Sequence, residues 1–263
     1  MQTMYPALFV PRPKVQFHRK RWDTPDRDFI DLDWVDGPES APLVALFHGL
    51  EGGSRSHYAL SFMRAVQQAG WRGVVVHFRG CGGESNWLPR AYHSGDAEEV
   101  DWVLRRLSRQ AGAAGLCAVG FSLGGNALLK WLAGAGSGAT GVVRAAAAVS
   151  APMDLHAAGN ALELGFNRVY TWHFLRSLKP KSQKKLCRFP GLYDSRAVDA
   201  ARTLREFDNV VTAPLHGFRD TDDYWTRASS KPHLIHIRAP ALIVNALNDP
   251  FVPAASLPGP AQV

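Results

Sequence analysis

The sequence Gly120-Phe121-Ser122-Leu123-Gly124-Gly125 decides how this chain is expected to fold. The apolar run Leu116–Val119 precedes it, and a helical pattern follows it over 126–132. A strand that turns directly into a helix over a serine between glycines is typical of a nucleophile elbow. Such a turn strains the backbone of the serine, and glycines leave room where a Cβ would collide with neighbouring chain. The stretch therefore predicts that Ser122 is held at the carboxyl end of a strand, beside the first amides of a helix.

A bare G-x-S-x-G match also arises by chance, and a plain strand-to-helix turn is its alternative. The surrounding pattern favours the elbow, because apolar runs alternate with helical patterns on both sides of it. The predicted strands cover residues 29–34, 43–47, 73–78, 116–119, 142–149 and 240–246, and the predicted helices 58–69, 97–107 and 126–132. Residues 1–28 are predicted to be irregular, and Asp96 with Glu99 resembles a capping box at the start of the second helix.

This alternation predicts an α/β fold with a mostly parallel, doubly wound sheet. The working site of such a sheet lies at the carboxyl ends of its strands. His48, Arg79, Ser122 and Ser150 all follow predicted strands and are expected at that edge.

The alternation stops over residues 151–239, which are rich in aromatic and long apolar side chains. A segment of this length without strand pattern predicts a helical cap inserted over the sheet edge. Its aromatic residues either pack the cap onto the core or line an acyl pocket, and packing is the commoner use. The expected division is therefore a first core part at 1–150, the cap at 151–239, and a core strand with an acid-bearing loop at 240–263.

Composition excludes several classes of protein. No apolar run of the 263 residues approaches the ~20 needed to cross a bilayer, and the N-terminus lacks the apolar segment of a secretory signal, so we expect a cytoplasmic location. Cys81, Cys117 and Cys187 have no metal-like spacing and are expected to be free thiols. The formal charge of +7 gathers in residues 12–21 and 179–188. No nucleic-acid-binding motif accompanies it, so these clusters are solvated surface or a peripheral contact with an anionic membrane.

Acyl transfer by a serine requires a nucleophile, oxyanion donors, a histidine and a carboxylate that orients the histidine. Ser122 is the candidate nucleophile, and the amides of Leu123 and Leu50 are the candidate oxyanion donors. Asp249 follows a later strand, in the chain order expected for the acid, although an Asp-Pro pair also forms turns. No metal and no cofactor is expected.

A histidine in the expected chain position is missing. All ten histidines precede Asp249, and fourteen residues follow it. A crossover of a dozen or more residues and a further strand would be needed to bring a later histidine back over Ser122. The last strand and helix of the predicted fold are therefore expected to be absent from this chain.

Four phrases together resemble the α/β-hydrolase superfamily, and within it the YheT-like branch, AB hydrolase family 4. They are His48–Ser54, Phe78–Gly83, Gly120–Asn126 and Asn245–Phe251, and the resemblance covers the chain from about residue 10. It implies a cofactor-free esterase or lipase of short-chain esters and acylglycerols. On that pattern Ser122 is the nucleophile and Asp249 the acid, while the family's later histidine has no counterpart here.

The sequence thus predicts a serine carboxylic-ester hydrolase that acts on an ester or lipid through an acyl-enzyme. The missing histidine motivates the alternative, a non-catalytic or truncated binding protein of the same fold. An acyltransferase is a third reading, because an alcohol can resolve an acyl-enzyme as water does. A dehalogenase is disfavoured by a serine at the nucleophile position, and a nucleotide site by the lack of a third glycine after Gly80 and Gly82.

Overall fold

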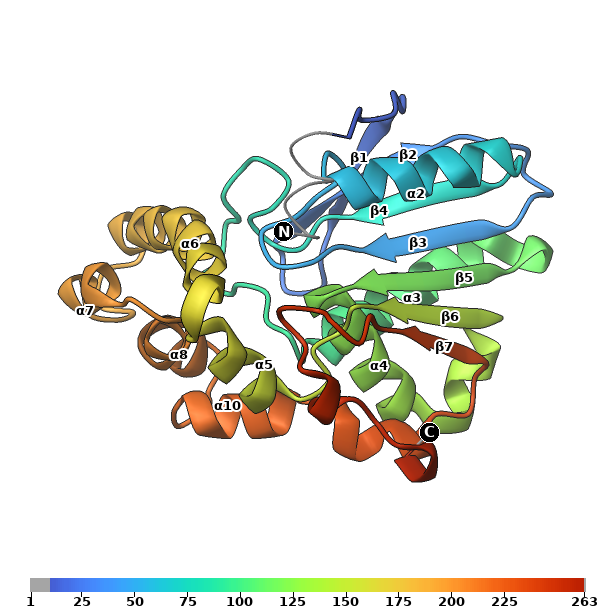
Figure 1. Ribbon diagram of the computed structural model, residues 1–263. Helices are drawn as coiled ribbons and strands as arrows, with labels where there is room; N and C mark the ends of the chain where they lie inside the picture. The colour runs from blue at the N-terminus through green and yellow to red at the C-terminus, as the bar shows by residue number, and fades with distance from the viewer. Residues whose placement is uncertain (1–9, 263) are drawn as a thin grey trace.

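A seven-stranded sheet forms the centre of the molecule in the computed structural model, which describes residues 10–262 (Figure 1). The strands lie in the order β1-β2-β4-β3-β5-β6-β7. Pairing is parallel from β4 through β7 and antiparallel where β2 meets β1 and β4. The predicted α/β-hydrolase type of sheet is confirmed. The strands are β1 (His18–Asp23), β2 (Phe29–Val35), β3 (Leu43–Phe47), β4 (Arg72–Val76), β5 (Leu116–Phe121), β6 (Ala145–Val149) and β7 (Ala241–Val244).

Strand β1 corrects the prediction that residues 1–28 are irregular. Residues 1–9 of that stretch lie outside the described residues. Within β1, Arg19 and Arg21 pair with Asp33 and Asp31 of β2, at Nε–Oδ1 distances of 2.7 and 2.8 Å. Cross-strand ion pairs of this kind stabilise an edge strand that lacks the alternating apolar and polar residues by which strands are predicted from sequence. Part of the first basic cluster is therefore matched by acids on the neighbouring strand.

Helices cover both faces of the sheet, as predicted. Successive residues of β3 point to opposite faces. Val44 and Leu46 join the cluster that α2 covers, whereas Ala45 and Phe47 join the larger cluster under α3 and α4. The buried runs of the central strands thus face apolar side chains on each side. These helices are α2 (His57–Gln68), α3 (Ala97–Ala111) and α4 (Leu123–Ala135).

The start of α3 confirms half of the predicted capping box. Asp96 accepts a hydrogen bond from the amide of Glu99 at 3.4 Å. The Glu99 side chain does not return the bond and instead accepts one from Arg79 Nε at 2.5 Å. Glu99 therefore bonds to Arg79, which is distant in sequence, and not to the nearby amide of Asp96.

The predicted helical cap is present as six helices beyond the carboxyl ends of the parallel strands, the direction in which their arrowheads point in Figure 1. Two small apolar clusters hold it together, one around Tyr224 and Trp225 and one around Leu175 and Phe207. Leu234, by contrast, packs in the main core. The cap helices are α5 (Leu155–Leu162), α6 (Arg168–Arg188), α7 (Ser195–Ala200), α8 (Leu204–Phe207), α9 (Ala213–Leu215) and α10 (Thr221–Ala228).

Strand β7 lies at the open edge of the sheet. Leu242 and Val244 are 61% and 46% exposed, unlike the buried residues of the central strands. Within residues 10–262, no helix has the length and apolar character needed to span a membrane.

The elbow between β5 and α4 is held by close backbone packing. A Cβ on Gly124 would lie 2.6 Å from the carbonyl oxygen of His48 and would also meet that of Phe47. A Cβ on Gly120 would collide with Gly124 and Gly125. These glycines therefore allow the first turn of α4 to lie directly against the end of β3.

We expect Gly124→Ala to destabilise the fold by about 3 kcal/mol, because backbone carbonyls cannot move aside for the added methyl group. Gly134→Ala in the same helix is the matched control, since nothing lies within 4 Å of its Cβ position. It should be neutral or stabilise the helix by up to about 1 kcal/mol. Urea unfolding of both variants measures the difference, and equal stabilities would contradict the packing argument.

Candidate active site

Ser122 occupies a strained turn between β5 and α4. Its φ of 51° and ψ of −119° lie in a region that non-glycine residues rarely adopt. The amide of Ser122 donates to the carbonyl of Val149 at 2.9 Å, which continues the β5–β6 pairing up to the turn. Strain of this kind persists only where surrounding contacts hold the backbone. The sheet and α4 supply those contacts.

The segment His48–Ser54 lies beside this turn. A Cβ on Gly49 would be 3.1 Å from the Cβ of Ser122, so Gly49 lies directly beside the Ser122 side chain. The amide of Gly49 donates to the Tyr58 hydroxyl at 2.8 Å, and the amide of Gly52 to the Gly49 carbonyl at 2.9 Å. Within residues 10–262, no acceptor takes a hydrogen bond from the amide of Leu50.

The buried side chain of His48 links this turn to the loop after β4. One ring nitrogen, Nδ1, lies 2.7 Å from the Gly49 carbonyl and donates to it, and Nε2 accepts from the amide of Phe78 at 3.1 Å. Burial lowers the pKa of His48 to about 3. With both nitrogens engaged and the ring neutral, His48 is a structural residue of the turn and is not placed to relay the Ser122 proton.

A second buried cluster anchors the far end of the same segment. Asp33 accepts hydrogen bonds from Ser54 Oγ at 2.5 Å, from His77 Nε2 at 2.8 Å and from Arg19 at 2.7 and 2.9 Å. Burial alone would raise the pKa of Asp33, but these donors hold it well below its usual range. His77 follows β4 directly.

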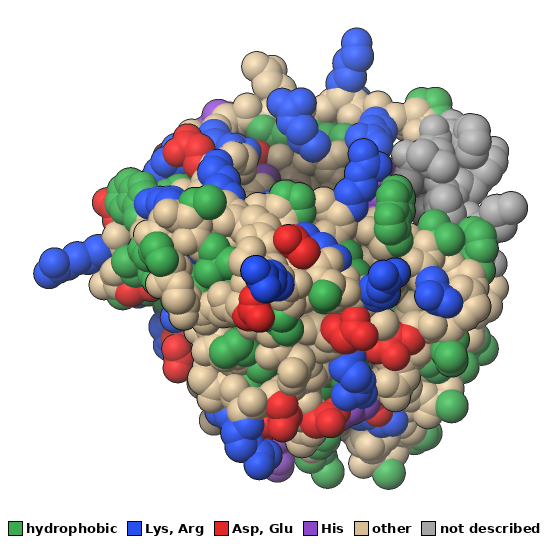
Figure 2. Space-filling view, turned by 90° about the vertical axis from the view of Figure 1, so that its left-hand side faces the viewer, with side chains coloured by type: hydrophobic (Ala, Val, Ile, Leu, Met, Phe, Trp, Pro, Cys, Tyr) green, Lys and Arg blue, Asp and Glu red, His purple; other side chains and the backbone are tan. Residues whose placement is uncertain are grey.

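A cavity of about 220 Å³ opens between the sheet edge and the cap. Ser122, Leu50 and Leu123 line it together from the core side. The cap contributes apolar side chains, while basic residues of α6 lie at the same cavity. Figure 2 shows Lys and Arg side chains around a hollow near the top of the cap face. The lining includes Leu155, Leu162, Phe174, Phe207, Val211, Trp225, Lys181, Lys185 and Arg188.

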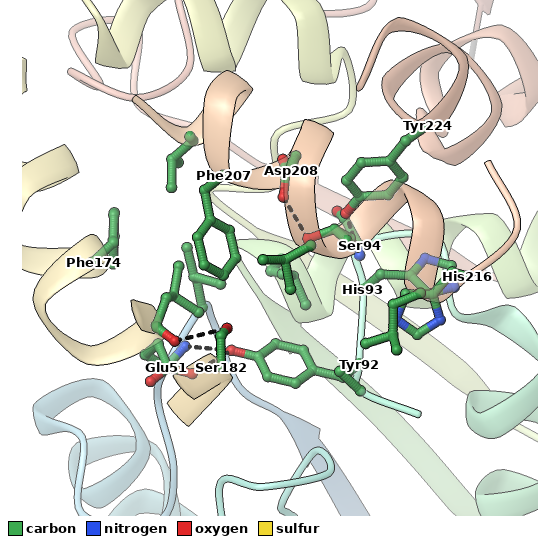
Figure 3. A pocket seen from close by; sticks show the side chains of 18 of the residues that line it. Glu51, Tyr92, His93, Ser94, Phe174, Ser182, Phe207, Asp208, His216 and Tyr224 are labelled. Carbon is green, nitrogen blue, oxygen red and sulfur yellow. Dashed lines mark hydrogen bonds between the residues drawn. The ribbon is translucent and has the colours of Figure 1, made fainter. Parts of the chain in front are cut away.

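The aromatic residues of the cap serve both of the predicted uses. Phe207 and Trp225 are buried in cap clusters and also line the cavity, and Figure 3 shows Phe207 beside it. Phe166 and Trp172 do neither, because each is 60% exposed and absent from the cavity. The same aromatic side chains, Phe207 and Trp225, therefore both pack the cap and line the cavity.

Three polar side chains that the sequence did not single out for the site also line the cavity, Asp208 and His216 from the cap and His93 from the loop before α3 (Figure 3). Asp208 accepts from Thr212 Oγ1 at 2.7 Å and from Trp225 Nε1 at 2.9 Å, and burial raises its pKa to about 6. His93 and His216 lie with ring centroids 4.6 Å apart, and burial lowers the pKa of each to about 3. Only the tertiary fold brings these residues together at the cavity, so no local sequence signal could have found them.

Asp249 lies in the loop after β7, near the cavity but not lining it. Its amide donates to the Ala246 carbonyl at 3.1 Å, and its Oδ1 accepts from the amide of Phe251 at 2.8 Å. Phe251 and Val252, just beyond it, do line the cavity. The local bonds are those of a turn-forming aspartate.

No histidine of the described chain is hydrogen-bonded to Ser122 or to Asp249. No group of three His, Cys, Asp or Glu side chains within residues 10–262 has the arrangement of a metal site. Cys81 is partly buried, and burial raises the pKa of its thiol to about 12, so it is not an activated thiol.

Comparisons with known proteins agree with this fold. Residues 42–263 match the family described as alpha/beta hydrolase fold. The chain is 43% identical to "Putative esterase YheT" of Escherichia coli (strain K12), over 99% of this chain and 77% of that protein. It is 32% identical to "Phospholipase ABHD3" of Mus musculus, over 98% of this chain but only 64% of that protein. The crystal structure of a membrane phospholipase A aligns with a TM-score of 0.55 and 19% identity, over 91% of this chain and 73% of that chain.

The buried His48 predicts a specific pH dependence of stability. Its pKa is about 3 in the folded chain and about 6.5 in the unfolded one. Between these values the unfolded state binds the extra proton, so the free energy of unfolding falls as pH falls. His48→Gln removes this contribution. The slope of the free energy of unfolding against pH should therefore be smaller in this variant by about 1.4 kcal/mol per pH unit between pH 6 and 4.

Tyr58→Phe is the control for this measurement, because it removes another contact of the same turn without removing an imidazole. It should lower the free energy of unfolding and leave the slope unchanged. Urea titrations at several pH values give both quantities, and a His48→Gln slope equal to that of the parent chain would contradict the assignment.

Proposed function

Because this chain belongs to the family described as alpha/beta hydrolase fold, we propose that it is a serine carboxylic-ester hydrolase with Ser122 as its nucleophile. The contact between Gly49 and Ser122, beneath a cavity that Leu50 and Leu123 also line, is the observation that supports this most directly. Two curated relatives carry the names of an esterase and a phospholipase.

In the proposed reaction, Ser122 Oγ attacks the carbonyl carbon of a bound ester. The carbonyl oxygen becomes an oxyanion that accepts hydrogen bonds from the amides of Leu50 and Leu123. Two preorganised donors of this kind contribute about 3 kcal/mol each to transition-state stabilisation. The alcohol then leaves with the proton from Ser122, and water hydrolyses the acyl-enzyme to release the acid.

The substrate we propose is an ester or lipid with an apolar acyl chain. The cap side of the cavity is apolar, with Leu155, Leu162 and Phe174 among its lining. Polar residues, among them Ser94 and Glu51, line the cavity as well. An alcohol acceptor in place of water would make the same acyl-enzyme a transferase, and product analysis with added alcohols separates the two.

The second candidate function is a binding protein of the same fold without turnover. It is favoured by the absence, within residues 10–262, of a histidine bonded to Ser122. Triad members act as a unit, so a serine without its base loses several orders of magnitude in rate. The two candidates therefore differ in the rate of reaction at Ser122.

Exposure to a fluorophosphonate probe should modify Ser122, located by mass spectrometry of the peptide that contains it. Ser122→Ala should remove the modification and lower p-nitrophenyl ester turnover by 10³-fold or more. Ser150→Ala is the matched control, since Ser150 has a similar φ of 50° after β6 but does not line the cavity. A parent chain that is no more reactive than Ser122→Ala would favour the binding protein.

Asp249→Asn tests the proposed acid. Asparagine keeps the Oδ1 that accepts from Phe251, so the turn is retained while the negative charge is lost. A carboxylate that orients a catalytic base contributes about 10⁴-fold to kcat. No histidine within residues 10–262 is bonded to Asp249, so a large fall in turnover with little change in melting temperature is expected only if a base joins Asp249 in the working enzyme. Turnover equal to that of the parent chain would leave Asp249 as a turn-forming residue only.

A further inference from the structure

Glu51 joins the turn beside Ser122 to the cap. It follows Leu50 directly, and its side chain is only 8% exposed. Its two carboxylate oxygens accept from different parts of the molecule, Oε1 from the core and Oε2 from the cap. A buried carboxylate with partners on both sides of a cavity is a physical link between them.

The core partner of Glu51 is Tyr92. The Tyr92 hydroxyl donates to Glu51 Oε1 at 2.9 Å and accepts from the Glu51 amide, also at 2.9 Å. Burial raises the pKa of Tyr92 well above its ordinary value, so the hydroxyl keeps its proton and remains a donor. This pair of bonds fixes the Glu51 backbone as well as its side chain, and Figure 3 shows the Tyr92 hydroxyl directed at Glu51.

The cap partners of Glu51 are two residues one turn apart on α6. Ser177 Oγ donates to Glu51 Oε2, and Lys181 Nζ lies 2.7 Å from the same oxygen. Residues four positions apart share one face of a helix. That face of α6 also bears Leu178, Ser182 and Lys185 at the cavity, so the contact orients the part of the cap that lies over Ser122.

The backbone of Glu51 is strained. Its φ of 55° lies in the left-handed region, which costs about 1–3 kcal/mol for a residue with a side chain. Glycines stand at 52 and 53, where this geometry would cost less, yet the chain places a glutamate at 51. The bonds to Tyr92, Ser177 and Lys181 are what hold the strained conformation.

We propose that Glu51 is a positioning residue through which helix α6 of the cap holds the Leu50 amide toward Ser122. The inference rests on the proposed function in one respect, the role of the Leu50 amide as an oxyanion donor. When α6 is docked, the carboxylate is neutralised by Lys181 and the turn keeps its strained form. When α6 moves away, a buried carboxylate loses its cation, and the turn relaxes to bring that charge to water.

Hydrogen–deuterium exchange of the peptide covering residues 48–54 tests this link without any need for catalysis. The amides of Glu51 and Gly52 are hydrogen-bonded in the turn, so their exchange reports its integrity. Glu51→Gln and Lys181→Met should each raise exchange in this peptide about tenfold, because each leaves the buried contact without its ion pair. Ser177→Ala removes a cap contact while leaving no buried charge unpaired, and should raise exchange by a smaller factor.

Two variants control for simpler explanations. Lys181→Arg keeps the positive charge, so its exchange at residues 48–54 should match that of the parent chain. If Lys181→Met acted through lost packing of the lysine side chain and not through lost charge, Lys181→Arg would also show raised exchange. Lys184→Met removes a cation from the same helix at an exposed position with no hydrogen bond or ion pair to residues 10–262, and should change nothing. Far-ultraviolet circular dichroism and urea unfolding confirm that each variant remains folded.

Kinetics of the same variants tests the catalytic part. If Glu51 positions the Leu50 amide, Glu51→Gln lowers kcat for a p-nitrophenyl ester about tenfold and Ser177→Ala lowers it by a smaller factor, while KM changes less than about twofold in both. Parent-like exchange at residues 48–54 in both Glu51→Gln and Lys181→Met overturns the link. Altered exchange with kcat unchanged overturns the positioning role. If the parent chain is as inert as Ser122→Ala while exchange responds as expected, the proposed function fails and the link between cap and turn stands.

Discussion

The close approach of α4 to the end of β3 is the constraint on which the rest of the site depends. Gly124 lies against the carbonyls of Phe47 and His48, with no space for a methyl group between them. Because the helix begins so close to the strand, the backbone must turn sharply at Ser122, and the following turn at Gly49 comes into contact with it. The elbow and the neighbouring turn thus depend on one backbone contact.

Polar contacts hold the turn at 48–54 at three separate points. His48 bonds it to Phe78 in the loop after β4, the Asp33 cluster bonds it to β2, and Glu51 bonds it to the cap. Each of these groups is buried, where an unpaired charge or polar atom costs several kcal/mol. Such contacts specify geometry more than they add stability, since a buried ion pair gains little over apolar packing. Two of them belong to the core, and only the Glu51 contact depends on how the cap is docked.

The chemistry at Ser122 combines a well-formed turn with a missing proton acceptor. The two histidines nearest the cavity, His93 and His216, pack against each other with their pKa values lowered to about 3 by burial, which leaves them weak bases. His48 is committed to the backbone on both nitrogens. The features that would bind a carbonyl and its developing charge are therefore more complete within residues 10–262 than those that would move a proton.

The sequence by itself determined the sheet, the elbow and the existence of a helical cap, because these follow from local periodicity and from glycines at fixed spacing around Ser122. It missed β1, whose pairing with β2 depends on cross-strand ion pairs of Arg19 and Arg21 that leave no apolar pattern. It also could not identify Glu51, Asp208 or Tyr92 as parts of the site. The partners of Glu51 lie 41 to 130 positions away, and the indole partner of Asp208 lies 17 positions away. Spacing along the chain carries no trace of such contacts. Only the tertiary structure decided which side chains meet over Ser122, since burial and hydrogen bonding there are set by how the cap docks on the sheet.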